Sequence, residues 1–185
     1  NGTACFAHWC IETERLAAEA IRILTPAGVV IGEVKPDGYT RVCVPAVRNI
    51  THDVAVEAGG QSFVGDFCIT GIPHYVVTVP DVMAVDVSRY GRLLRHHEQF
   101  APRGACVDFV EHTGEREIRM RTFEFGVEAE TFACGTGSTS AAILSALRYG
   151  WVEACVAEKL PVLVHAIGGT LRIFFERDAD GVFDP

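Results

Sequence analysis

The sequence lacks several features that would place the chain in a specialised class of protein. No apolar run approaches the roughly 18 residues that a membrane-spanning helix needs. Basic residues are few, with 16 Lys and Arg against 24 Asp and Glu, a net charge of −8 and a pI near 5.3. This balance argues against a nucleic-acid partner. No low-complexity tract occurs, and 185 residues with ample apolar content suffice for one large domain or two small ones.

No signal peptide is visible in the sequence, which opens at Asn1 without an initiating methionine. We therefore interpret the chain as a fragment or processed form, and we expect a cytoplasmic location. The seven cysteines are odd in number and include no Cys-x-x-Cys pair, which argues against a disulfide framework and a zinc ribbon. Reduced thiols are the better interpretation.

One group of residues near the N-terminus has a spacing that could suit a metal. Cys5, His8 and Cys10 are close in sequence, but their neighbours are apolar and the stretch reads as helical. Buried thiols explain this pattern better than ligation, because a free cysteine behaves as a small apolar residue. We predict no metal site.

The remaining pattern is dominated by short β-branched runs with one long helix in each part of the chain. We predict helices at residues 1–18, 85–97 and after Cys134, and a linker at 45–52. We predict strands at residues 21–25, 29–34, 39–44, 54–57, 62–70, 75–79, 106–111, 117–125, 161–166 and 170–176. The first three should form an antiparallel meander, and the last four should form two hairpins. The fold class is therefore α+β, with two small units split near residue 46.

The stretch from Glu130 to Ala142 is the strongest candidate for a functional site. A strand-like segment leads to Cys134, then Gly-Thr-Gly and a helix of about 12 residues that ends at Gly150. The cysteine would stand at a helix N-terminus, where unpaired N–H groups and the helix dipole favour a thiolate and could bind a carboxylate. A buried cysteine beside a glycine turn is the structural alternative.

The chain start repeats this arrangement. Asn-Gly-Thr-Ala-Cys-Phe-Ala at residues 1–7 opens a helix much as Cys-Gly-Thr-Gly-Ser-Thr-Ser opens the later one. Two glycine-headed helices suggest two related halves that face one site. A phosphate-binding loop is disfavoured, because Gly-Thr-Gly-Ser-Thr lacks the lysine which that motif needs.

Three motifs together resemble the diaminopimelate epimerase family. They are Glu-Ala-Glu-Thr-Phe-Ala-Cys-Gly-Thr-Gly at 128–137, Gly-Ile-Pro-His-Tyr-Val-Val at 71–77, and the opening segment. Their order and spacing also match, so the likeness covers essentially the whole chain. The resemblance implies two pseudo-symmetric α+β domains, each mostly antiparallel sheet around a central helix, with residues 1–46 as the remainder of the first and 47–185 as the second. It also implies truncation at both ends.

The resemblance further implies a cofactor-independent isomerase whose substrate is a small molecule, an amino acid. In the family, two cysteines, one from each domain, flank the α-carbon. One thiolate removes the proton and the other thiol returns one to the opposite face. The family default converts LL- to meso-diaminopimelate in lysine and peptidoglycan biosynthesis. Assembly as a homodimer is left open by the sequence.

The family's site residues carry over as follows. Cys134 matches one catalytic cysteine, Glu124 the acidic residue near the α-amine, and His74 the histidine of the Pro-His step. Gly135 and Thr136 match backbone donors to the α-carboxylate.

The second half of the family site falls at the very start of the chain. Asn1 matches the donor in the family's Cys-Gly-Asn-Gly motif. The partner cysteine would therefore lie two residues before Asn1, and the chain alone is expected to be inactive.

Elementary chemistry agrees with this assignment. Removing a proton beside a carboxylate builds negative charge, which needs fixed donors in a dry site. Helix N-termini supply such donors and also lower the pKa of a thiol toward neutral pH.

Three positions depart from the family pattern at the distal end of the substrate. Ile72, Cys106 and Phe125 stand where the family has asparagine, asparagine and arginine. A distal carboxylate would lose charge-assisted hydrogen bonds there, at a cost on the order of several kcal/mol. Two alternatives to the default therefore stay open: a racemase of an amino acid with a more apolar side chain, and a catalytically dead binding protein of the same fold.

Overall fold

The structure is a computed structural model that describes residues 2–13, 20–25 and 28–185. The chain divides into two compact units, Asn1–Val44 and Pro45–Pro185. No helix in the described ranges combines the length and apolar character that crossing a membrane requires. All seven cysteines are free thiols.

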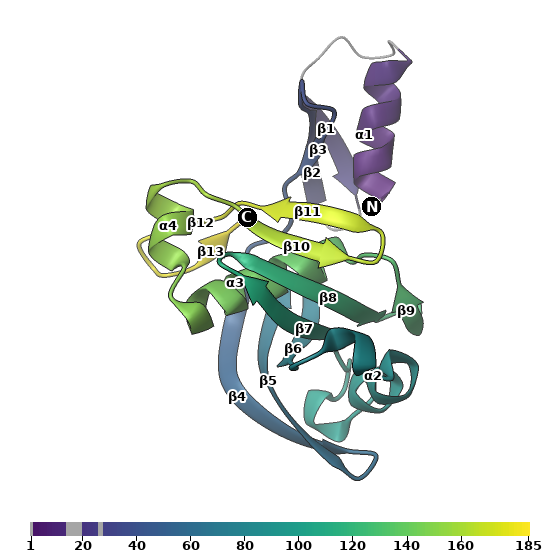
Figure 1. Cartoon of the computed structure of the whole chain (residues 1–185). Helices are drawn as coiled ribbons and strands as arrows, with labels where there is room; N and C mark the ends of the chain where they lie inside the picture. The colour runs from purple at the N-terminus through teal and green to yellow at the C-terminus, as the bar shows by residue number, and fades with distance from the viewer. Residues whose placement is uncertain (1, 14–19, 26–27) are drawn as a thin grey trace. The chain divides into compact units, whose positions relative to one another are not determined.

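The first unit is a helix packed on a small antiparallel sheet (Figure 1). Its elements are α1 (Gly2–Glu12), β1 (Ala20–Thr25), β2 (Gly28–Val34) and β3 (Thr40–Val42), with the sheet order β1-β2-β3. The predicted meander is therefore confirmed. Ala7, Cys10 and Ile21 form its small core. The predicted helix extends to residue 18, but residues 14–19 lie outside the described part of the chain.

The second unit is built on an eight-stranded sheet with the order β11-β10-β8-β7-β6-β5-β4, and β9 pairs with β8. The strands are β4 (Arg48–Ala58), β5 (Gln61–Thr70), β6 (Ile72–Thr78), β7 (Cys106–Gly114), β8 (Glu117–Glu124), β9 (Ala129–Thr131), β10 (Val162–Ala166) and β11 (Gly169–Ile173). The β6–β7 and β8–β10 pairs are parallel, whereas the other pairs are antiparallel. Both predicted hairpins, β7–β8 and β10–β11, are present. The mixed α+β class is confirmed.

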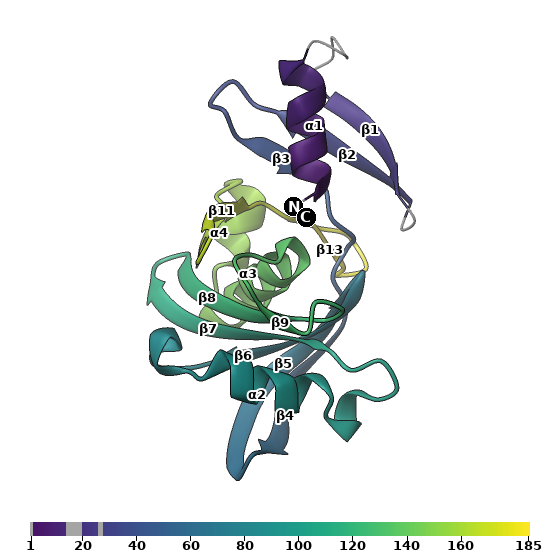
Figure 2. The ribbon, with the colours of Figure 1, turned by 90° about the vertical axis from the view of Figure 1, so that its right-hand side faces the viewer.

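Helices cover both faces of this sheet, as Figure 2 shows. On one face lies α2 (Val87–Arg95), and on the other lie α3 (Gly135–Tyr149) and α4 (Val152–Ala157). Two short 3-10 helices, η1 (Val82–Ala84) and η2 (Glu98–Phe100), flank α2, and two short strands, β12 (Glu176–Arg177) and β13 (Phe183–Asp184), pair near the C-terminus.

The two faces have separate apolar cores because successive strand residues point to opposite sides. The core between the sheet and α3 is called the α3 core, and the core between the sheet and α2 is called the α2 core. On β6, Val76 belongs to the α3 core, whereas Tyr75 and Val77 belong to the α2 core. On β7, Val110 belongs to the α3 core and Phe109 to the α2 core. The central strands are thus buried on both sides, which explains their nearly continuous apolar runs.

The linker predicted at residues 45–52 is wrong, because most of it belongs to β4. This strand lies at the edge of the sheet and is largely exposed, so it shows no regular apolar alternation. Asn49 and Asp53 have positive φ, and the register with β5 shifts between Arg48 and Val54. These bulges break the period-two pattern by which a strand is recognised in sequence.

Candidate active site

The strands β6 and β7 place three polar side chains on the face that α3 covers. His74 is paired with Cys106 across the parallel ladder, and Val76 is paired with Asp108. His74, Cys106 and Asp108 therefore share the face of Val76 and Val110, which line the α3 core. All three polar residues are fully buried.

The N-terminus of α3 brings Cys134 to this polar end of the sheet. Cys134 caps the helix, and its Sγ accepts a hydrogen bond from the backbone N–H of Gly137 at 3.4 Å. Its Sγ also lies 3.4 Å from Thr136 Oγ1. The first N–H groups of a helix have no intrahelical acceptor, and here they belong to Gly135 and Thr136. The predicted cysteine at a helix mouth is present, and its side chain is nearly buried.

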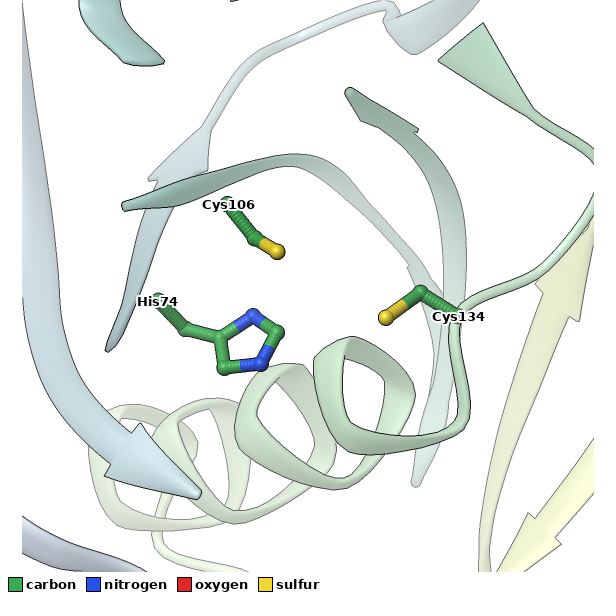
Figure 3. A group of neighbouring side chains, drawn as sticks. All are labelled: His74, Cys106 and Cys134. Carbon is green, nitrogen blue, oxygen red and sulfur yellow. The ribbon is translucent and has the colours of Figure 1, made fainter. Parts of the chain in front are cut away.

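Three reactive side chains from three elements converge here, as Figure 3 shows. The Sγ atoms of Cys106 and Cys134 and one ring nitrogen of His74 all lie within 4.8 Å of one another. Thr136 links two of them, because its Oγ1 lies 3.1 Å from His74 Nε2 and 3.4 Å from Cys134 Sγ. Residues far apart in sequence thus form one compact group.

Asp108 holds this group in place and is the residue that the sequence analysis missed. Its Oδ2 lies 2.8 Å from His74 Nδ1, and its Oδ1 accepts a 2.6 Å hydrogen bond from Thr122 Oγ1. A Cβ at Gly137 would stand 2.6 Å from Asp108 Oδ1, so only glycine lets the carboxylate approach the helix. The sequence did contain a signal for Asp108. It is a charged residue in an apolar strand, two positions after Cys106, and residues i and i+2 of a strand lie on the same face.

The surroundings of the two thiols shift their pKa values in opposite directions. The hydrogen bond from the Cys106 thiol lowers the pKa of Cys134, although burial and the Asp108 carboxylate act against this shift. The same hydrogen bond, together with burial, raises the pKa of Cys106. Cys134 therefore ionises more readily than Cys106. For His74, burial lowers the pKa, but the Asp108 carboxylate outweighs it and leaves the pKa raised.

The other predicted site residues lie around this group. Glu124, at the end of β8, is partly buried, and its Oε1 accepts a 3.0 Å hydrogen bond from Thr131 Oγ1. Its charge is close enough to raise the pKa of His74 as a smaller contribution. Asn1 lies outside the described residues.

Ile72, Cys106 and Phe125, which the sequence places at the distal end of the substrate, do not form a group of their own. Ile72 and Phe125 are partly buried. The backbone N–H of Phe125 donates to Cys106 Sγ at 3.3 Å. The Phe125 ring faces the Arg95 guanidinium, whose central carbon lies 4.1 Å from the ring centroid. Cys106 thus turns toward Cys134 rather than standing apart from the reaction centre.

The N-terminal residues Cys5, His8 and Cys10 do not gather in this way. Cys5 is exposed and Cys10 is buried, as expected for residues on different sides of a helix. His8 pairs with Glu12 at 2.9 Å. Among the described residues, His74, Cys106 and Cys134 are the one group of three with metal-ligand geometry.

Comparisons with known proteins agree with the sequence resemblance. Residues 67–184 match the family described as Diaminopimelate epimerase. The chain is 38% identical over 189 residues to the diaminopimelate epimerase of Aquifex aeolicus (strain VF5), covering 99% of this chain and 63% of that protein. It is 33% identical to that of Acinetobacter baylyi, covering 95% and 64%. The chain thus spans slightly less than two thirds of the length of these relatives.

Solved structures at low sequence identity share the fold, and two of them are an epimerase and a probable racemase. A hydroxyproline epimerase from Agrobacterium vitis matches with a TM-score of 0.73 and 16% identity, covering 98% of this chain and 60% of that one. A probable proline racemase from Agrobacterium radiobacter matches with a TM-score of 0.72 and 19% identity, covering 98% and 61%. These likenesses bear on the fold alone.

Proposed function

Because the chain belongs to the diaminopimelate epimerase family, we propose that it is part of an amino-acid epimerase that inverts an α-carbon by removing and returning a proton. The observation that carries this proposal is the position of Cys134 at the mouth of α3. Diaminopimelate is the default substrate, since the curated relatives bear that name.

Cys134 is the acid–base group on one face of the α-carbon. Its sulfur accepts from the Gly137 N–H, and this donor and the nearby Cys106 thiol favour the thiolate over the thiol. A thiolate abstracts the α-proton and becomes a thiol. The reverse step returns a proton from the same sulfur, so Cys134 serves both directions of the reaction. The family mechanism assigns the opposite face to a second cysteine.

The N–H groups of Gly135 and Thr136 would bind the α-carboxylate. Proton removal turns this carboxylate into an enediolate with additional negative charge, which fixed donors and the helix dipole stabilise. Glu124 would pair with the α-amine. His74 is fully buried and bonded to Asp108 and Thr136. It therefore acts as a positioning residue for Thr136 and Cys134.

A second candidate is a racemase of an amino acid with an apolar side chain. Cys106 is committed to Cys134 and to the Phe125 N–H, and the Phe125 ring covers the Arg95 guanidinium. Arg95 is itself paired with Glu128 and donates to the Arg103 carbonyl, so it does not offer a free bidentate cation to a distal carboxylate. A site without such donors cannot compensate for the free-energy cost of removing a charged distal centre from water.

The proposal is tested by following exchange of the α-hydrogen with deuterium from solvent. In a chain extended upstream of Asn1 to include the Cys-Gly of the family motif, we expect exchange and epimerisation. Cys134→Ser should slow both by about 10²–10⁴-fold, because a hydroxyl is far less acidic than a thiol. Cys155→Ser, which removes a buried thiol outside the site, should leave the rates near those of the parent chain. Absence of exchange in a folded extended chain would favour the binding-protein alternative.

Substrate choice is decided in the same assay by comparing kcat/KM for diaminopimelate with that for leucine and phenylalanine. If the distal end has become apolar, the apolar amino acids should be preferred. Phe125→Arg combined with Cys106→Asn should then shift the preference toward diaminopimelate by at least about tenfold. Met83→Arg, which adds the same charge at an exposed position outside the site, is the control. A strong preference for diaminopimelate in the parent chain would rule out the second candidate.

A further inference from the structure

The group formed by His74, Cys106 and Cys134 has a donor set that acid–base chemistry at Cys134 does not require. Proton transfer at one face needs one thiol, yet two sulfurs and one imidazole nitrogen lie within 4.8 Å of one another. Figure 3 shows the three side chains pointing toward a common centre from β6, β7 and the start of α3. The second thiol stands at a position where the family pattern has an amide.

We propose that Cys106, Cys134 and His74 bind a thiophilic divalent cation, with Zn²⁺ as the best fit. Two thiolates and one imidazole are a donor set that zinc prefers in tetrahedral sites, with Zn–S near 2.3 Å and Zn–N near 2.0–2.1 Å. These bond lengths place the donor atoms about 3.4–3.8 Å apart in a tetrahedron. From a spacing of 4.8 Å, the outer limit of their present separations, the donor atoms would therefore close in by up to about 1.4 Å.

The surroundings of His74 match those of a metal-binding histidine. Such a histidine donates its other ring N–H to a carboxylate, which fixes the tautomer and the ring orientation. Here Asp108 Oδ2 lies 2.8 Å from Nδ1, and Thr122 in turn donates to Asp108 Oδ1. Nδ1–H then points to Asp108, and the lone pair on Nε2 faces the same Thr136 hydroxyl that Cys134 Sγ faces.

The charges and protons balance. Binding of M²⁺ to one thiolate and one thiol forms two metal–sulfur bonds and releases the proton of the remaining thiol to solvent. Two thiolates neutralise the dication in a fully buried setting, which favours the bound state over an uncompensated buried charge. The Thr136 hydroxyl or a water completes the fourth position.

Metal binding and acid–base use of Cys134 exclude each other, because both need the same sulfur lone pair. The bound cation would therefore hold the site inactive. The inference does not rest on the proposed epimerase activity, since the donor atoms are present whether or not the chain acts on an amino acid.

The experiment measures zinc and cobalt binding to the full 185-residue chain, stripped with a chelator and kept reduced by a phosphine. In competition with a chromophoric chelator, we expect one Zn²⁺ per chain. Co²⁺ should give a thiolate-to-metal charge-transfer band and the ligand-field bands of a tetrahedral site. Cys106→Asn and His74→Gln should each weaken Zn²⁺ binding on the order of a hundredfold or more, and Asp108→Asn about 10–100-fold.

Two controls separate this site from other thiols in the chain. Cys5→Ser removes an exposed cysteine and Cys155→Ser a buried one, and neither should change the stoichiometry or the affinity. Circular dichroism of each variant establishes that it is folded. Unchanged Zn²⁺ affinity in folded Cys106→Asn would overturn the proposal.

X-ray absorption of the zinc-loaded parent chain provides a measurement that needs no variant. We expect two sulfur ligands near 2.3 Å and nitrogen or oxygen ligands near 2.0–2.1 Å. A shell without sulfur, a shell of four sulfurs, or less than one tightly bound ion per chain would each refute the site.

Discussion

The unequal character of two neighbouring thiols is the central feature at the residue scale. The interaction between Cys106 and Cys134 lowers the pKa of Cys134 and raises the pKa of Cys106. Gly137 N–H and the start of α3 act in the same direction on Cys134. The thiol at position 106 therefore shifts the pKa of a side chain on another element.

This asymmetry predicts how the metal-free chain responds to pH. Because the pKa of Cys134 is lowered, its thiolate should persist at pH values below the ordinary thiol midpoint of about 8.5. The measurement is the ultraviolet thiolate absorbance that the parent chain has and Cys134→Ser lacks, followed against pH with a chelator present. Cys106→Ala removes the thiol donor and should move the midpoint upward. A parent midpoint at or above about 8.5 would contradict the assignment of Cys134 as the thiolate.

The sequence could predict some residues of the site and not others. Cys134, Gly135 and Thr136 follow from a local pattern, because a glycine-headed helix sets the geometry of its own first turn. Asp108 and the closeness of Cys106 to Cys134 depend on a parallel pairing between β6 and β7. Such a pairing joins segments about thirty residues apart, and no local propensity determines it.

At the scale of elements, too, the sequence predicts some strands and misses others. The central strand β7 was recognisable because burial on both faces demands an apolar run. The strand β8 was recognisable because the buried residues Ile118 and Met120 alternate with arginines. The edge strand β4 was not, because its exposure and bulges leave no periodicity to detect. The elements that position the site were therefore the easier ones to predict.

The packing of α2 on β8 leads to a prediction about one glycine. A Cβ at Gly91 would lie 2.5 Å from Phe123 Cβ, so the helix can approach the strand only without a side chain there. Alanine in a helix gains about 1 kcal/mol over glycine, but this clash should outweigh the gain. We expect Gly91→Ala to lower the free energy of unfolding by about 1–3 kcal/mol, measured by urea denaturation. Ser88→Ala, on the exposed side of α2, should change it by less than about 0.5 kcal/mol. A Gly91→Ala variant as stable as the parent would show that α2 shifts freely on the sheet.

For the whole molecule, the two units differ greatly in the apolar core that each encloses. The unit of residues 45–185 has two cores, one on each face of its sheet, and contains Cys134, His74, Cys106 and Asp108. The unit of residues 1–44 has a described core of Ala7, Cys10 and Ile21. A segment of about 40 residues with so small a core falls below the size that usually folds without further support.

This difference predicts the behaviour of the separated units. Residues 45–185 alone should unfold cooperatively in urea, retain near-ultraviolet circular dichroism, and bind one Zn²⁺ with the affinity of the whole chain, because all the proposed ligands lie within that unit. Residues 1–44 alone should lack a cooperative transition. If instead residues 45–185 fail to fold, or if they fold but lose the zinc site, then the first unit contributes to the stability or geometry of the Cys134 region. That result would place the determinants of the site in both units.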